Sequence, residues 1–280
     1  MKRRFALLAV VVLVSLAGCS ALPVWDEGDT GTTPAPDDST PTATATPTGE
    51  SSDSVPSADP DADPGSGPAD ADYPDGYGPD GVTDAGTAAT THIDALAGYD
   101  GYIFSYDSLI QAGDANTTFT YQQIVDRADE RAYVIQDTGE ASQVSYFEDD
   151  RVYIRVESDD EVRYNDSDRA YNMSEFSGIQ FVGPLLANVE YGNATVHETE
   201  EGTFYSYASE NVTDPGAILR SDVDEIDSFE TSIVIDERGT IRRAAFVVES
   251  DRTVSVQMGF GELNATDVQR PDWFEQANDS

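Results

Sequence analysis

The sequence predicts an α+β domain whose antiparallel sheet curves strongly around helices. The first observation is the order of the elements: a helix, a run of strands, an apolar helical insert and further strands. The second is that short polar turns separate successive strands, as antiparallel neighbours require. A long segment poor in apolar residues precedes these elements. We therefore divide the chain into a signal peptide (1–18), a disordered acidic Thr/Pro-rich tether (19–85) and a folded domain (86–280).

The first predicted element of the domain is a short amphipathic helix over residues 84–97. Ala88, His92 and Leu96 lie on one side of this helix, and Gly98 provides a stop signal. Alternation of apolar and polar residues then predicts strands over 102–106, 119–121, 131–135, 144–147 and 152–156. Near the end of the chain, consecutive antiparallel strands are expected over 229–235, 240–249 and 253–260.

A mostly apolar stretch over residues 173–189 separates the two groups of strands. Its helical spacing predicts a helix that covers the sheet as a lid or plug. The apolar residues of this insert include Phe176, Ile179, Phe181, Leu185 and Leu186. Because a proline inside a helix removes one backbone donor and clashes with the preceding turn, we expect a break or kink at Gly183-Pro184. A second short helix is expected over 215–219.

The N-terminus has the pattern of an exported protein. Lys2, Arg3 and Arg4 precede an apolar stretch over 5–16, which is shorter than the roughly 20 residues that a membrane-spanning helix needs. The stretch leads into Leu-Ala-Gly-Cys, which ends at Cys19, the only cysteine. This run resembles the lipobox of lipoproteins, and the resemblance implies cleavage before Cys19 and lipid attachment to its sulfur. The alternative is an ordinary cleaved signal peptide.

From the lipobox we expect the protein to be anchored at the extracellular face of the cell membrane through lipidated Cys19. The tether that follows is too poor in apolar residues to offset the entropy of ordering the chain. A flexible chain of about 65 residues has an end-to-end distance of about 45 Å, which lets the domain stand clear of the membrane.

Acidic residues dominate the composition. The chain has 54 Asp and Glu residues, and Lys2 is its only lysine, so the mature chain keeps 12 arginines and a net charge of −42. Such a chain repels itself strongly at ordinary ionic strength, whereas in molar salt the Debye length of about 3 Å screens the repulsion. The composition resembles that of secreted proteins of extreme halophiles, above all haloarchaea. It disfavours nucleic acid as a partner.

Glycosylation motifs are unusually dense. The chain has eight asparagines, and all except Asn188 begin an Asn-x-Ser/Thr motif. These sequons predict N-glycosylation on an exposed domain. The predicted acceptors are Asn116, Asn165, Asn172, Asn193, Asn211 and Asn264, with Asn278 as a further motif close to the C-terminus.

Few residues offer catalytic or metal chemistry. His92 and His197 are the only histidines, and Cys19 is the only cysteine, so zinc sites with several nitrogen or sulfur ligands are excluded. The sequence contains neither a Gly-x-Ser-x-Gly elbow nor a glycine-rich phosphate loop. We therefore expect no catalytic residues, no metal and no cofactor, and we predict that the protein is not an enzyme.

The order of the elements resembles the LolA/LppX type of lipoprotein carrier. The lipobox, the acidic stalk and a helix leading into Tyr99-x-x-Tyr102 are also similar to a group of uncharacterised haloarchaeal surface lipoproteins. The resemblance implies an incomplete β-barrel with helices on its concave face, which binds an acyl chain or a whole lipid. It identifies no ligand-binding residue in this chain.

Two functions remain open from the sequence. In the first, aromatic residues on the strands line an apolar cleft, and the lipoprotein binds or carries a hydrophobic, lipid-like ligand in a half-barrel. In the second, the same aromatic residues fill a solid core, and the protein is a structural or interaction glycoprotein of the cell surface without a ligand. The sequence identifies no protein partner.

Overall fold

The computed structural model describes residues 68, 70–158, 161–221, 226–264 and 266–279. The signal peptide, the lipidation residue Cys19 and most of the tether lie outside the described residues. None of the helices in the described part is both long enough and apolar enough to cross a membrane.

The packed part of the chain begins before residue 86, inside the segment that we assigned to the tether. A small hairpin of β1 (Tyr77–Gly78) and β2 (Gly81–Val82) precedes the first helix. The ring of Tyr77 is buried and lies 5.9 Å from the ring of Tyr207. Aromatic burial therefore attaches this short segment to the sheet, although its Pro- and Gly-rich sequence is typical of a linker.

The domain contains one large antiparallel sheet in the order β8-β7-β6-β5-β4-β3-β13-β12-β11-β10-β9. The strands are β3 (Gly101–Ala112), β4 (Ala115–Asp126), β5 (Arg131–Asp137), β6 (Ala141–Glu148), β7 (Arg151–Ser158), β8 (Glu161–Asp168), β9 (Thr195–Thr199), β10 (Gly202–Ser209), β11 (Ser228–Asp236), β12 (Ile241–Glu249) and β13 (Thr253–Gly261). β8 and β9 form the two edges and do not pair with each other, so the curved sheet stays open. The predicted fold class is confirmed.

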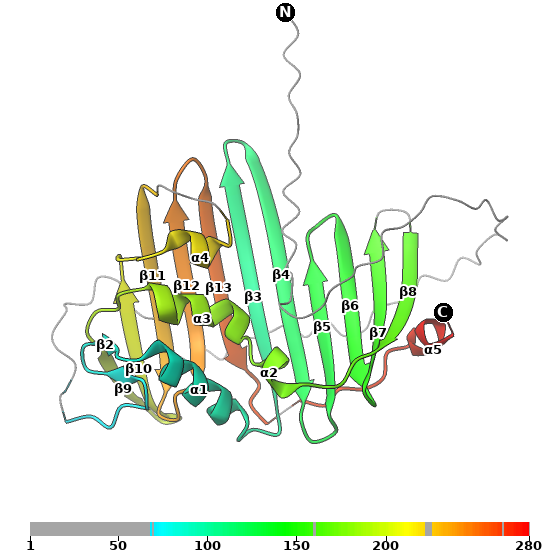
Figure 1. Cartoon of the computed structure of the whole chain (residues 1–280), viewed down its shortest axis with the longest axis horizontal. Helices are drawn as coiled ribbons and strands as arrows, with labels where there is room; N and C mark the ends of the chain where they lie inside the picture. Colours follow the sequence, from blue (N-terminus) through cyan, green and yellow to red (C-terminus); the bar gives the residue numbers. More distant parts are fainter. Residues whose placement is uncertain (1–67, 69, 159–160, 222–225, 265, 280) are drawn as a thin grey trace, which may run out of the picture. The chain divides into compact units, whose positions relative to one another are not determined.

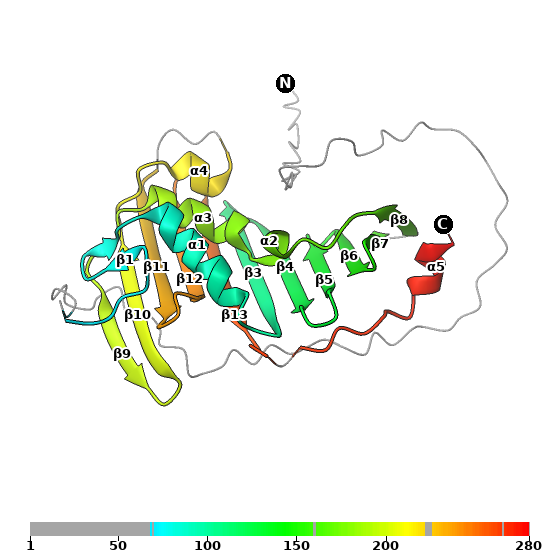
Figure 2. The ribbon, with the colours of Figure 1, turned by 60° about the horizontal axis from the view of Figure 1, so that its bottom comes forward.

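Helices lie on the concave face of the sheet (Figures 1 and 2). They are α1 (Ala85–Leu96), α2 (Met173–Phe176), α3 (Ile179–Asn188) and α4 (Pro215–Leu219). α1, α3 and α4 lie over β3 and β10–β13, and α2 lies next to β4. Asp84 caps α1 by accepting a hydrogen bond from the Thr87 backbone N–H at 2.7 Å, so the helix starts where the sequence predicts.

The helical insert breaks at Gly178, whereas α3 continues without a break through Gly183-Pro184, where we expected a break or kink. Gly178 separates α2 from α3 with a φ of +63°, a left-handed conformation that favours glycine. It also lies against the sheet, since a Cβ atom at this position would be 2.7 Å from the Phe260 ring. Both the conformation and the close approach explain why the chain turns here.

Pro184 lies inside α3, where another group replaces its missing hydrogen bond. A proline at this position cannot donate to the carbonyl oxygen of Gln180, four residues earlier. The guanidinium of Arg220, which follows α4, donates to this oxygen. The same guanidinium lies 5.5 Å from the centre of the Phe181 ring. Arg220 therefore connects α4 to the helix that Pro184 would otherwise weaken.

His92 connects three parts of the fold from the buried side of α1. Its Nδ1 accepts a hydrogen bond from the Ile241 backbone N–H of β12 at 3.1 Å. Its Nε2 lies 3.1 Å from the carbonyl oxygen of Ser177, between α2 and α3, so the neutral ring donates there. The side chain is fully buried, and this burial lowers its pKa to about 4.

A second apolar cluster lies on the opposite face of the strands β5–β7. α5 (Phe274–Asn278) packs beside β7 and β8, and its Phe274 ring lies 4.4 Å from the ring of Tyr153. Arg270 approaches the buried carboxylate of Glu148 at 2.6 Å, and Arg131 approaches the same carboxylate at 2.8 Å. The C-terminal segment thus covers the outer side of this end of the sheet.

The buried His92 makes stability depend on pH. Its pKa is about 4 in the folded chain and 6.5 when exposed, so the unfolded chain binds more protons between these values. Neutral His92 makes its full contribution to the free energy of unfolding above pH 6.5. This contribution decreases as the pH falls towards 4, by about 3 kcal/mol in total. We expect the free energy of unfolding, measured by urea denaturation in molar salt, to decrease accordingly.

His92→Gln is the matched control because an amide keeps a donor and an acceptor but does not titrate. The carboxylates titrate in both proteins, so the difference between the two pH curves reports on His92. Parallel curves between pH 6.5 and 4 would contradict the prediction.

Candidate functional site

The half of the concave face under α1 and α3 is filled by side chains of the chain itself. Phe104 of β3 is buried, and its ring lies 4.6 Å from Phe260 and 5.5 Å from Phe181. Leu185 and Leu186 of α3 are buried in the same core. The helical insert therefore acts here as a plug, and we call this region the filled half.

The remaining concave face belongs to β5, β6 and β7, and we call it the open arm. Paired residues of antiparallel strands present their side chains on the same face, so the register defines this surface. The residues of the open arm are Ala132, Val134, Gln136, Ala141, Gln143, Ser145, Phe147, Val152, Ile154, Val156 and Ser158. None of them is charged.

Exposure increases along the open arm, away from α2. The first row, Ala132, Phe147 and Val152, is buried, and the Phe147 ring lies 5.1 Å from Phe176 of α2. In the second row Val134 and Ser145 are still buried and Ile154 is half-buried. Gln136, Gln143 and Val156 of the third row are half-buried, and Ser158 beyond them is exposed. The strands β5–β8 extend beyond the helices on this face (Figure 2). The open arm is therefore a neutral, partly apolar surface that helices α1, α3 and α4 leave uncovered.

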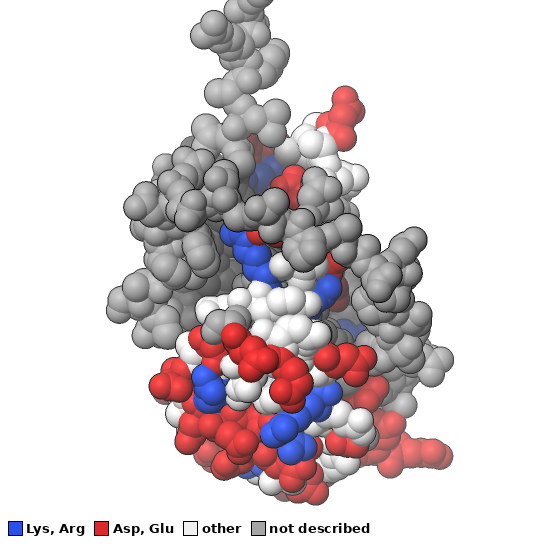
Figure 3. Space-filling view, turned by 90° about the vertical axis from the view of Figure 1, so that its right-hand side faces the viewer, with Lys and Arg blue, Asp and Glu red and all other residues white. Residues whose placement is uncertain are grey.

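The opposite face of the same three strands is charged. Its ionic residues are Arg131, Asp137, Glu148, Arg151, Arg155 and Glu157. Acidic side chains also gather at the β8 end of the domain, which Figure 3 shows from the side, and these include Glu161, Asp168 and Glu275. The absence of charge is thus limited to the concave side of β5–β7. On the next strand, Arg163 and Glu161 of β8 pair with Val156 and Ser158 and bring charge back to the concave face.

Polar side chains mark the border between the filled half and the open arm. Gln123 of β4 is 1% exposed, and its Nε2 donates to the Tyr121 hydroxyl at 2.8 Å and to the carbonyl oxygen of Glu175 at 3.0 Å. Burial raises the pKa of Tyr121 to about 12, so the hydroxyl stays protonated at neutral pH. This border combines aromatic rings with neutral hydrogen-bonding groups.

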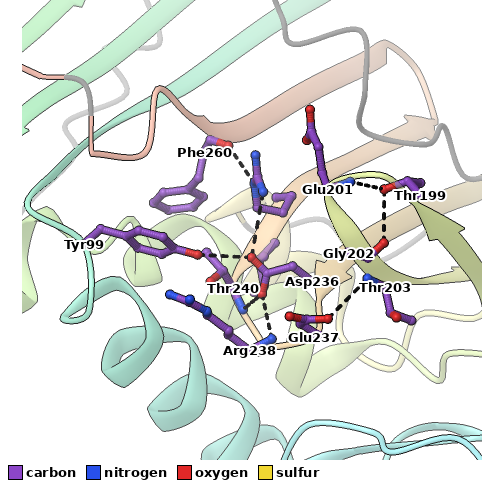
Figure 4. A network of polar contacts seen from close by, with 12 residues as sticks. Tyr99, Thr199, Glu201, Gly202, Thr203, Asp236, Glu237, Arg238, Thr240 and Phe260 are labelled. Atoms are coloured by element: carbon purple, nitrogen blue, oxygen red, sulfur yellow. Dashed lines mark hydrogen bonds and ion pairs between the residues drawn. The ribbon is translucent and has the colours of Figure 1, made fainter.

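A separate polar pocket of about 450 Å³ lies at the turn between β11 and β12 (Figure 4). Its central residue is Asp236, whose Oδ1 accepts hydrogen bonds from the backbone N–H groups of Arg238 and Thr240 at 3.0 and 2.9 Å. Arg242 lies 3.8 Å from its other oxygen. Burial nevertheless raises the pKa of Asp236. These contacts satisfy the carboxylate inside the turn, so its arrangement is that of a structural hairpin.

The sequons lie mostly at the surface. Of the predicted acceptors, Asn193 is half-buried, and the others are exposed: Asn116, Asn165, Asn172, Asn211, Asn264 and Asn278. Asn172 also caps α2, and Asn264 accepts a hydrogen bond from the Asp100 N–H through its side-chain oxygen at 2.9 Å. The amide nitrogen, which carries the glycan, takes no part in either of these bonds. Glycosylation remains a prediction.

The two histidines lie in separate places. His92 is used inside the core, and His197 of β9 is half-buried with its Nε2 at 3.0 Å from the Ser206 hydroxyl. Within the described residues neither ring is hydrogen-bonded to a carboxylate, and no cluster of three or more possible metal ligands occurs there. The absence of enzymatic activity stays a prediction.

None of the open-arm residues can be identified as a binding site from the sequence alone. The alternation of apolar and polar residues predicts the strands β5–β7. It does not show how these strands pair, and the pairing is what places their neutral residues on one surface. The residues that the sequence suggested as a lid, among them Phe176 and Leu185, belong instead to the filled half.

Comparisons with known proteins give matches only at the level of the fold. No protein-family model and no curated protein matches the sequence. The chain is similar to the crystal structure of the Mycobacterium tuberculosis lipoprotein LppX, with 14% identity and a TM-score of 0.34 over 65% of this chain and 95% of that one. It is also similar to LprF from Mycobacterium bovis, with 10% identity and a TM-score of 0.32 over 67% and 96%.

A third similar structure is a LolA superfamily protein from Nitrosomonas europaea, with 10% identity and a TM-score of 0.24 over 67% of this chain and 95% of that one.

If the role of Asp236 is structural, the stability of the fold depends on its carboxylate oxygen as a hydrogen-bond acceptor more than on its negative charge. Asp236→Asn keeps an acceptor for the two turn N–H groups, whereas Asp236→Ala leaves them without a partner, which costs about 1–3 kcal/mol for each buried group. We therefore expect Asp236→Ala to lower the free energy of unfolding several times more than Asp236→Asn does, as measured by urea denaturation. Equal losses for the two variants would contradict this reading.

Proposed function

We propose that this protein is a membrane-anchored, extracellular binding lipoprotein that holds an amphipathic, lipid-like molecule on the open arm of its sheet. The single observation that carries the proposal is the neutral character of this half-exposed surface in a chain with a net charge of −42 after removal of the leader. A solvated face of such a chain is expected to carry acidic residues, as the edge of β8 does.

The site of binding differs from the one that the sequence suggested. Under α1 and α3 the rings of Phe104, Phe181 and Phe260 occupy the interior of the half-barrel. A guest molecule there would have to displace packed side chains, which is costly in a close-packed core. The open arm offers Ile154 and Val156 half-buried, so covering them removes further apolar surface from water.

The filled half favours a second candidate function. A domain with a solid core, seven sequons and an acidic surface fits a structural or interaction glycoprotein of the cell surface without a ligand. Extraction of the mature protein, purified in molar salt from the cells that produce it, separates the two. A stoichiometric lipid in the organic extract supports the carrier, and a lipid-free protein that also fails to take up added lipid supports the glycoprotein.

The open arm gives a mutational test of binding. We expect Val156→Asp to weaken the binding of a radiolabelled lipid by about tenfold or more, because the bound chain would have to desolvate a carboxylate. Binding is measured as co-elution of the lipid with the protein in gel filtration. Val162→Asp is the matched control, since Val162 is 42% exposed on the opposite face of β8, and this variant should bind normally. Equal binding by both variants would place the ligand elsewhere.

The anchor has a separate test. Cys19→Ser removes the sulfur that receives the lipid, so we expect the variant to appear in the culture medium and the wild type in the membrane pellet. Mass spectrometry of the wild-type N-terminus should detect a lipid on the first residue. An unmodified N-terminus on a membrane-associated protein would refute lipid anchoring through Cys19.

A further inference from the structure

The border between the filled half and the open arm contains an amide oxygen without a partner. Gln123 makes both of its hydrogen bonds through Nε2, and one of them goes to the carbonyl oxygen of Glu175, which can only accept. The orientation of the amide is therefore fixed. Its Oε1 is buried and accepts no hydrogen bond from any described residue. A buried acceptor in this state destabilises the fold unless another group reaches it.

A donor without a partner lies beside the same tyrosine. The side chain of Gln180, at the start of α3, faces the Tyr121 hydroxyl: a weak polar interaction between them acts to lower the pKa of Tyr121, against the dominant effect of burial, but no hydrogen bond of normal geometry forms. Its Nε2 is buried and donates to no described residue. Because Gln123 also contacts the Tyr121 hydroxyl, the unpaired acceptor and the unpaired donor belong to one small site.

The charged groups around the site already have partners. Arg220 donates to the backbone carbonyl oxygen of Gln180. Arg169 and Glu175 form an ion pair with an N–O distance of 2.5 Å. They act on the pKa of Tyr121 in opposite directions, so their effects oppose each other at the hydroxyl. The adjoining open arm carries no charge. A neutral group that both donates and accepts is therefore a better match than a carboxylate or an ammonium group.

The register then places an apolar path next to this site. Gln123 pairs with Val134, Val134 with Ser145, and Ser145 with Ile154, so these side chains form one row across the concave face. Val156 lies in the next row. We propose that Gln123 and Gln180 bind the uncharged headgroup of the ligand, a hydroxyl or an amide, while its hydrocarbon chain lies across the open arm. This inference rests on the proposed function.

The experiment compares two probes with the same chain. 1-O-hexadecylglycerol has two free hydroxyls, and its dimethyl ether can accept but not donate. Binding of each radiolabelled probe to the full mature protein is measured by gel filtration in molar salt. We expect the diol to bind about tenfold more tightly, the effect of losing a good hydrogen bond. Palmitate, with a charged headgroup, should bind more weakly than the diol.

Gln123→Met tests the acceptor with a side chain of similar length. We expect it to lower the affinity for the diol about tenfold and to leave that for the dimethyl ether unchanged. Gln122→Met is the matched control, because Gln122 is the neighbouring residue of the same strand and its side chain lies on the opposite face of the sheet. If Gln123→Met does not fold, Gln180→Met, a change at a half-buried helix position, decides the question: it removes the donor, so we expect it to weaken the binding of the diol and of the dimethyl ether by similar factors.

The outcomes separate this inference from the proposed function. Equal binding of the diol and the dimethyl ether by the wild type, or a preference for palmitate, overturns the headgroup assignment and leaves the binding function standing. An unchanged preference for the diol in folded Gln123→Met also overturns it, as does unchanged binding of both probes by Gln180→Met if that variant has to decide. If the wild type binds none of the three probes, both proposals fail.

Discussion

The alternation of side chains across the sheet is the constraint on which the rest of this structure depends. The chain must expose a large excess of acidic residues to water. Each strand of an open sheet has one face that can be exposed to solvent and carry them. On β5–β7 the charged residues occupy the convex side, and the neutral ones share the concave side. A shift of register by one residue would move Arg155 and Glu157 onto the concave surface. Strand pairing therefore decides where a neutral surface exists at all.

The helical insert determines how much of that surface stays available. The left-handed turn at Gly178 directs α3 across β3 and β13, where Phe181 joins the aromatic cluster of the core. α2 ends before this turn and stays beside β4. The bond from Arg220 to the Gln180 carbonyl keeps α3 helical up to Pro184. Together these contacts place α3 on one half of the sheet. In the described part of the chain, the insert contacts the concave side of β5–β7 through Phe176 of α2, at the border.

Most of the fold is predictable from the sequence because local signals determine it. The cap at Asp84 and the apolar spacing of α1 define the first helix, and polar turns define the hairpins. β8 escaped prediction because its sequence, Glu161–Asp168, alternates little and is almost entirely polar; only its pairing with β7 makes it a strand. The break of the insert was misplaced because proline is a strong local signal, whereas the requirement for Gly178 comes from distant aromatic rings.

The candidate site was less predictable than the fold for a related reason. Gln122 and Gln123 are adjacent and chemically identical, and only the sheet shows that Gln123 faces the helices and has an unpaired oxygen. No local pattern distinguishes them. The same holds for Val156 and Val162, whose different roles follow from the faces that they occupy.

The convex face explains how the open arm can remain free. A three-stranded arm needs apolar burial on at least one side to be stable. Here Phe274 and Val268 provide it by packing against Tyr146 and Tyr153 on the outer side. The paired contacts of Glu148 with two arginines fasten the C-terminal segment along this side. Ala132, Val134, Phe147 and Val152 of the arm are buried in the main core, so folding explains why they are apolar. Gln136, Gln143 and Val156 lie outside that core, and the lack of charge there needs a reason other than folding. Contact with an uncharged, partly apolar molecule supplies that reason.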